Sequence, residues 1–125
     1  DGFLNAIQGA DWTLSFLRLA DAAQGRGGAL LALMPDPGPM MAWLPRWRAV
    51  IGPDAPDSLR ATNPAVIPRN HQVEQALLAA EQGDFAPFHA LLAAIRDPFG
   101  SEVGREGYTL PAPQGLAPYV TFCGT

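Results

Sequence analysis

The segment 63–74 constrains the fold most, because two prolines four residues apart stand directly before a helical pattern. Pro64 and Pro68 each fix one φ angle and disfavour helical backbone at the residue before them, so the segment between them should be extended. Asn70 follows at the position where a side-chain oxygen caps a helix. Apolar residues then recur with the spacing of one helix face: Val73, Ala76, Leu77 and Ala80. We expect this stiff connector to fix how the helices before it meet those after it.

A second helix is predicted directly downstream, with apolar residues at the same spacing: Phe88, Leu91, Leu92 and Ile95. Gly83 is the expected C′ glycine of the first helix, and Asp84 is the expected cap of the second. A single residue between the two helices favours a tight antiparallel pair.

Clusters of proline and glycine divide the first half of the chain into short helices. Asp11 is the predicted N-cap of a helix over residues 12–23. The apolar stripe predicted for that helix is Trp12, Phe16, Leu19 and Ala23. A helix over residues 40–51 follows, where Pro45 should cause a kink or a late start.

These patterns predict a mostly α protein, with short helices joined by Pro/Gly-rich loops over residues 1–100 and an extended tail over residues 101–125, ending in Cys-Gly-Thr. The net charge of −4 does not suggest a nucleic-acid partner or an anionic membrane surface. No apolar run is long enough for a transmembrane helix. Since the chain opens on Asp1 rather than Met, we expect it to be a piece of a longer protein.

Few residues of the chain carry candidate chemistry. His71 and His89 are the only histidines, and neither has a partner at metal-ligand spacing, so no metal site is predicted. Arg69 could bind a phosphate, but an arginine in such a place more often ties a carboxylate or the carbonyls at a helix end. We assign the connector a structural role, carried by its polar residues and prolines: Asn63, Pro64, Pro68, Arg69, Asn70 and His71.

Trp47 stands between two arginines, Arg46 and Arg48. Such a surface can bind an acidic partner or a nucleobase. The favoured interpretation is a core-facing tryptophan beside solvated arginines.

Cys123 is the only cysteine, so the chain cannot form an internal disulfide. An accessible thiol on a tail can exchange or oxidise, whereas a buried one is a small apolar residue beside Phe122. The residues alone leave both interpretations open. A single cysteine fits a reducing cytoplasm.

The connector also belongs to a longer pattern, Asn63-Pro64-x-x-Ile67-Pro68-Arg69-Asn70-His71-x-Val73-Glu74. Together with Gly83-Asp84, Asp97-Pro98-Phe99 and the final Thr121-Phe122-Cys123-Gly124-Thr125, it resembles the C-terminal signature of the selenoprotein O family. The resemblance covers the second half of the chain well. It covers the first half loosely, through Asp11-Trp12-Thr13 and residues 43–48.

The resemblance implies a bacterial, cytoplasmic, kinase-like protein that transfers AMP from ATP to hydroxyl groups of protein substrates. It implies that this segment braces an upstream kinase-like domain, which would hold ATP and magnesium. No catalytic residue and no cofactor is assigned to the segment itself, which has no lysine. The resemblance also implies a redox role for Cys123, through pairing with a cysteine of the kinase-like domain. The alternative is an independent helical module that binds a protein through Trp43, Trp47 and the Pro-rich loops, without catalysis.

Overall fold

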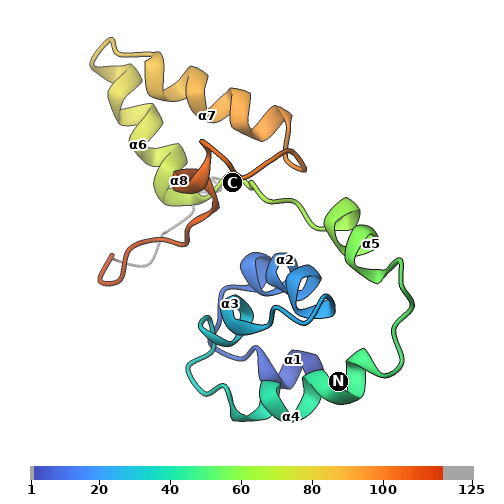
Figure 1. Cartoon of the computed structure of the whole chain (residues 1–125). Coiled ribbons are helices and arrows are strands. Elements are labelled where there is room, and N and C mark those ends of the chain that lie inside the picture. The colour runs from blue at the N-terminus through green and yellow to red at the C-terminus, as the bar shows by residue number, and fades with distance from the viewer. Residues whose placement is uncertain (1, 117–125) are drawn as a thin grey trace, which may run out of the picture. The chain divides into compact units, whose positions relative to one another are not determined.

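The structure of the protein, a computed structural model, describes residues 2–116. Within these residues it contains only helices and loops, which confirms the predicted mostly α class (Figure 1). The helices are α1 (Gly2–Ala6), α2 (Trp12–Ala23), α3 (Gly28–Leu31), α4 (Gly38–Arg48), α5 (Ala55–Thr62), α6 (Asn70–Glu81), α7 (Ala86–Arg96) and α8 (Glu106–Thr109). The chain divides into two compact units, unit 1 (Asp1–Ala65) and unit 2 (Val66–Thr125). The predicted change from a helical region to a tail at residue 101 stays a prediction, and α8 adds one helical turn beyond it.

Helix α2 begins and ends where the sequence indicated. The carboxylate Oδ1 of Asp11 accepts a hydrogen bond from the Leu14 N–H at 2.8 Å, so the predicted cap is confirmed. The Ser15 hydroxyl adds a second bond to the same turn, to the Asp11 carbonyl at 2.7 Å. This local satisfaction of N-terminal N–H groups explains why the start of the helix could be predicted.

The predicted apolar stripe of α2 is partly wrong. Leu19 is buried, but Trp12 is 60% exposed. Leu14 and Leu17 are buried instead, in a small cluster with Ala65. The physical reason is that α2 packs against α5 as well as α3, so more than one side of the helix is covered.

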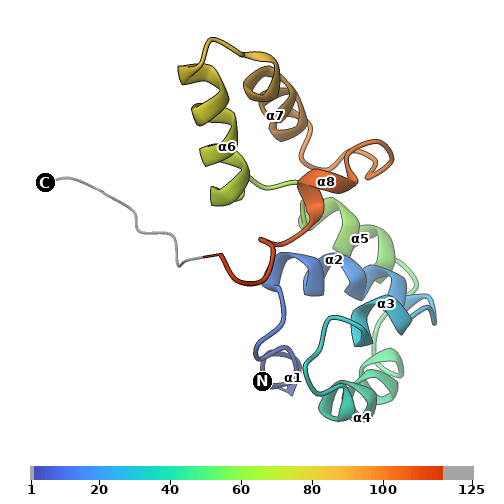
Figure 2. The same ribbon diagram turned by 90° about the vertical axis from the view of Figure 1, so that its left-hand side faces the viewer.

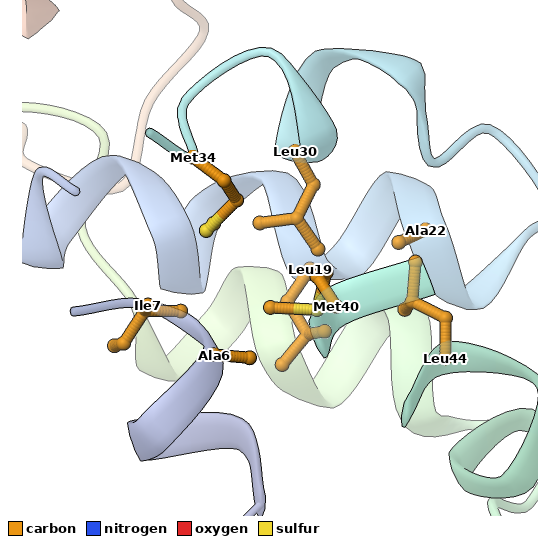
Figure 3. Packing of buried hydrophobic residues seen from close by; sticks show 8 residues of the cluster. All are labelled: Ala6, Ile7, Leu19, Ala22, Leu30, Met34, Met40 and Leu44. Atoms are coloured by element: carbon orange, nitrogen blue, oxygen red, sulfur yellow. The ribbon is translucent and has the colours of Figure 1, made fainter. Parts of the chain in front are cut away.

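The main core of unit 1 is built from α1, α2, α3 and α4 and the segments that follow α1 and α3 (Figure 3). Leu30 of α3 and Met40 of α4 are fully buried. In Figure 3 their side chains point toward those of the other core residues: Ala6, Ile7, Leu19, Ala22, Met34 and Leu44. Helix α4 begins at Gly38 and contains Pro45, so a late start caused by this proline is wrong. Pro39 lies in its first turn, where a missing N–H costs nothing.

In unit 2, α6 and α7 form an antiparallel pair and lie side by side (Figures 1 and 2). The connection has four residues, 82–85, rather than one. Gly83 has φ +88°, its N–H donates to the Ala80 carbonyl at 3.0 Å, and the Asp84 N–H donates to the Ala79 carbonyl at 2.9 Å. The Asp84 carboxylate accepts from the Ala86 N–H at 3.0 Å. The predicted helix stop at Gly83 is therefore confirmed. Asp84 bonds to the first helical N–H, but the N-cap of α7 is Phe85, one residue after the predicted cap.

The predicted apolar faces of this pair are only partly buried. Ala76 and Leu91 are buried as expected. Leu77 is 51% exposed and Phe88 is 38% exposed, so their assignment to the core is wrong. Two helices alone cover only the stripe where they touch, and residues on the flanks of that stripe stay in water.

Replacing Gly83 by Ala should lower the free energy of unfolding of the α6–α7 pair by about 1–2 kcal/mol, because an L-residue pays this to adopt a left-handed backbone. Hydrogen exchange of the α6 and α7 amides measures the change. Gly107→Ala is the matched control in the same unit, since an added Cβ there meets nothing within 4 Å and Gly107 has no positive φ. Equal effects of the two substitutions would contradict the assigned turn.

Candidate functional site

The connector runs from unit 1 into unit 2, and Asn63 stands at its start in unit 1. Asn63 is the C-cap of α5, in extended conformation at φ −110° and ψ 114°, as expected for a residue before proline. Its backbone N–H and its side-chain Nδ2 both donate to the Leu59 carbonyl, at 3.0 and 2.8 Å. Ala65 and Val66, which follow Pro64, are buried. The prolines thus lead the chain out of α5 without a further helical turn.

Val66 ties the connector to the end of α7. Its N–H donates to the Pro98 carbonyl at 3.2 Å, and its side chain is 1% exposed. The Asp97-Pro98-Phe99 turn, noted as part of the sequence pattern, therefore pairs with the connector across more than thirty residues. Sequence spacing alone could not show this contact.

Arg69 and Gln72 join the start of α6 to α8. The Arg69 Nη2 donates to the Thr109 carbonyl at 3.0 Å, and Thr109 is the last residue of α8. The Gln72 side-chain Nε2 donates to the Gly107 carbonyl. Arg69 thus binds a helix-end carbonyl, which was the favoured interpretation, rather than standing free for a phosphate.

Asn70 is not the N-cap of α6, contrary to the prediction. It is the first helical residue and is exposed, and Arg69 is the N-cap, with no hydrogen bond from its side chain to the first turn. The Arg69 carbonyl accepts from the N–H groups of Gln72 and Val73, both at 3.0 Å. The helix therefore begins at Asn70 itself, one residue earlier than a cap at Asn70 would place its start.

His71 is half-buried in the first turn of α6. Among residues 2–116, no three His, Cys, Asp or Glu side chains gather where they could hold a metal ion. Cys123, the predicted redox residue, lies outside the described residues.

Arg105 is the residue that sequence reasoning missed. Its side chain is only 17% exposed and donates to three backbone carbonyls, those of Ser101, Asp97 and Ala94, at 2.7, 2.5 and 3.4 Å. It thereby satisfies carbonyls at the end of α7, which otherwise lack partners. An arginine shortly after a Pro/Gly helix stop was the available signal.

Gly100 completes this turn by leaving space. A Cβ at position 100 would lie 1.9 Å from Asp97 Oδ2 and 2.7 Å from Arg105 Nη2. Asp97 and Arg105 also form an ion pair at 3.8 Å. The turn Asp97-Pro98-Phe99-Gly100 therefore has a glycine at the position where the Asp97 carboxylate and the Arg105 guanidinium come close to the backbone.

Backbone N–H groups hold the pKa of the Glu106 carboxyl below its usual value. Its own backbone N–H and that of Gly104 lower the pKa of the Glu106 carboxyl, with Gly104 N to Oε1 at 3.0 Å. A lowered pKa in the folded chain means that the bond stabilises this loop at neutral pH and is lost as the pH falls through that value. The carboxylate lies at the start of α8, where backbone N–H groups favour negative charge.

In unit 1, the tryptophans belong to a continuous row of aromatic rings. Consecutive centroids lie 5.0–5.2 Å apart, in the order Trp12, Phe16, Phe3, Trp43 and Trp47. Trp43 and Trp47 stack at an interplanar angle of 20° and are half-buried against the core. Arg46 and Arg48 are exposed. This confirms the interpretation of core-facing tryptophans beside solvated arginines.

None of the helices within residues 2–116 is both long and apolar enough to cross a membrane.

The chain is similar to bacterial proteins named protein nucleotidyltransferase YdiU. One from Cereibacter sphaeroides is 56% identical over 119 residues, which are 94% of this chain and 24% of the relative. One from Sphingopyxis alaskensis is 46% identical over 121 residues, and one from Chromobacterium violaceum is 44% identical over 130 residues, covering 25% and 27% of those relatives. The chain therefore spans about a quarter of the length of the curated relatives it matches. No family model and no solved structure matches it.

Proposed function

This chain belongs to the selenoprotein O family, and we propose that it is the C-terminal helical segment of a protein that transfers AMP from ATP to Ser, Thr or Tyr hydroxyls of other proteins. The observation that carries the proposal is identity of 44–56% to nucleotidyltransferases over nearly the whole chain. In this transfer, the hydroxyl oxygen bonds to the α-phosphorus of ATP. The hydroxyl proton passes to a base, and pyrophosphate leaves.

The catalytic groups of such a protein would lie in the three quarters of the relatives' length outside this chain. Nucleotidyl transfer depends on cationic groups and metal ions around the phosphates. This segment has eight arginines and no lysine. The described contacts of Arg69 and Arg105 include helix-end carbonyls. ATP and magnesium would accordingly be held by the kinase-like domain of the full-length protein.

The role of the segment itself would be to brace that domain and to carry Cys123. Unit 2 suits bracing, because side chains of Arg69, Gln72 and Arg105 hold its loops and helix ends in place. A rigid helical unit keeps its outer surface in one arrangement, which a docking role requires.

The full-length protein, incubated with ATP, Mg²⁺ or Mn²⁺ and a mixture of candidate proteins, should yield protein-linked AMP detectable by mass spectrometry. Residues 1–125 alone should yield none, because they lack the phosphate-binding groups. AMP transfer by the isolated segment would overturn the assignment of roles. Absence of any product from the full-length protein, including modification of itself, would overturn the AMP-transferase proposal.

The role of Cys123 can be tested separately in the full-length protein. Oxidised wild type should differ in AMP transfer from Cys123→Ser, and reduction should abolish the difference, because a disulfide to a second cysteine of the protein would be broken. Ser is a close match to Cys in size and leaves the rest of the tail unchanged. If the two proteins are equally active after oxidation, with Cys123 still a free thiol by mass spectrometry, the redox role is wrong.

The alternative, an independent interaction module, is distinguished by the gene sequence before Asp1. A kinase-like domain with a Gly-rich loop there favours the transferase, and an unrelated domain favours the module.

A further inference from the structure

Within residues 66–116, unit 2 exposes more large apolar side chains than it buries. Among its described residues, the buried apolar ones are Val66, Ala76, Leu91 and Ala94. The exposed large ones are Leu77, Leu78, Phe85, Phe88, Phe99, Val103, Leu110 and Leu116. Helices owe most of their stability to packing of an apolar face, and a unit with so small a core gains little from it.

Four of these exposed side chains belong to residues near one end of the α6–α7 pair. Leu77 and Leu78 lie in the second half of α6, and Phe85 and Phe88 lie at the start of α7. In an antiparallel pair these positions share the end that carries the connecting turn (Figure 2). Their exposed fractions are 51%, 52%, 55% and 38% in that order. We call this end the hairpin tip, defined by Leu77, Leu78, Phe85 and Phe88.

The charge around the hairpin tip has one sign. Between Arg69 and Arg96 the chain has no arginine or lysine, and its carboxylates there are Glu74, Glu81 and Asp84, all exposed. Interfaces combine an apolar centre with a polar rim of complementary charge. The hairpin tip therefore suits a partner with an apolar centre and a basic rim.

We propose that the hairpin tip docks on an apolar, basic-rimmed surface in the remainder of the same polypeptide. This inference rests on the proposed function, because it takes the segment to be part of a protein as long as its relatives. About three quarters of the length of those relatives lies outside this chain, which provides a covalently linked partner. Linkage keeps that partner at a high effective concentration, so the apolar side chains would be covered permanently rather than transiently.

Hydrogen exchange of the full-length protein tests the docking. The variant Leu78→Gln/Phe85→Gln changes two side chains that are each more than half exposed, so its effect on unit 2 itself should be small. If the tip is docked, the variant should exchange its amide hydrogens about tenfold faster than wild type, or more, in residues 70–96 and in one contiguous surface outside residues 1–125. A tenfold change corresponds to an interface weakened by about 1.4 kcal/mol. The matched control is Val50→Gln/Val103→Gln, at positions that are 81% and 83% exposed and are not among the four tip residues, which should leave both regions unchanged.

A second variant guards against misfolding of the first. Glu74→Arg/Glu81→Arg keeps the apolar side chains but reverses the rim charge, so it should raise exchange in the same two regions, and more so at low salt. Unchanged exchange outside residues 1–125 in both variants would overturn the proposal. So would a wild-type dimer, seen by light scattering, that the first variant converts to monomer, because the tip would then bind a second copy. AMP transfer measured on the same samples reports the proposed function independently: an inactive wild type with the expected exchange changes would refute the activity but not the docking.

Discussion

Replacing Leu30 by Ala should lower the free energy of unfolding of unit 1 by about 2–5 kcal/mol, the usual range for a cavity at a fully buried leucine. Leu30 is 0% exposed and lies among Leu19, Met34 and Met40 in the main core (Figure 3). Helix α3 has only four residues and cannot hold its own backbone without this contact. The loss should therefore lie in the upper part of the range.

Urea denaturation followed by tryptophan fluorescence measures this effect, because all three tryptophans lie in unit 1. Leu4→Ala is the matched control: Leu4 is 46% exposed in α1, and its truncation should change stability by about 0.5 kcal/mol or less. A loss for Leu30→Ala no larger than that for Leu4→Ala would show that α3 is not packed as described.

Replacing Arg105 by Ala should lower the free energy of unfolding of unit 2 by about 2–3 kcal/mol. Hydrogen bonds from a charged donor contribute roughly 1.5–3 kcal/mol each when buried, and water can replace part of this at a side chain that keeps some exposure. Arg105 donates to the carbonyls of Ser101, Asp97 and Ala94, so its loss should free the end of α7 and the loop before α8 together. Far-UV circular dichroism during urea denaturation and hydrogen exchange of α7 both report the change.

Two substitutions separate the contacts of Arg105 from its charge. Arg96→Ala removes an exposed arginine in the last turn of α7 and should cost only about 0.3–1 kcal/mol, through the helix dipole. Arg105→Lys keeps the charge but cannot reach three carbonyls with one ammonium group, so it should fall between wild type and Arg105→Ala. If Arg105→Ala costs no more than Arg96→Ala, the three carbonyl contacts contribute nothing measurable.

The family assignment and the division of labour within the protein depend on different observations. Identity to the nucleotidyltransferases extends over nearly all of this chain. The carbonyl contacts of Arg69 and Arg105 and the exposed hairpin tip are instead features of three-dimensional placement. Sequence identity to the relatives does not depend on these contacts.

The sequence by itself determined the features that depend on neighbours within about four residues. The Asp11 cap, the stop at Gly83, the extended backbone at Asn63 and the mostly α class follow from backbone geometry and local hydrogen bonds. Only the tertiary structure decided which side of each helix is covered: Leu14 is buried because α2 is covered on more than one side, and Leu77 is exposed because α6 meets only part of α7. The tertiary structure also decided the hydrogen-bond partners of Arg105, Arg69 and Val66. All three donate to backbone carbonyls that the fold brings close, and no repeating sequence pattern marks these carbonyls.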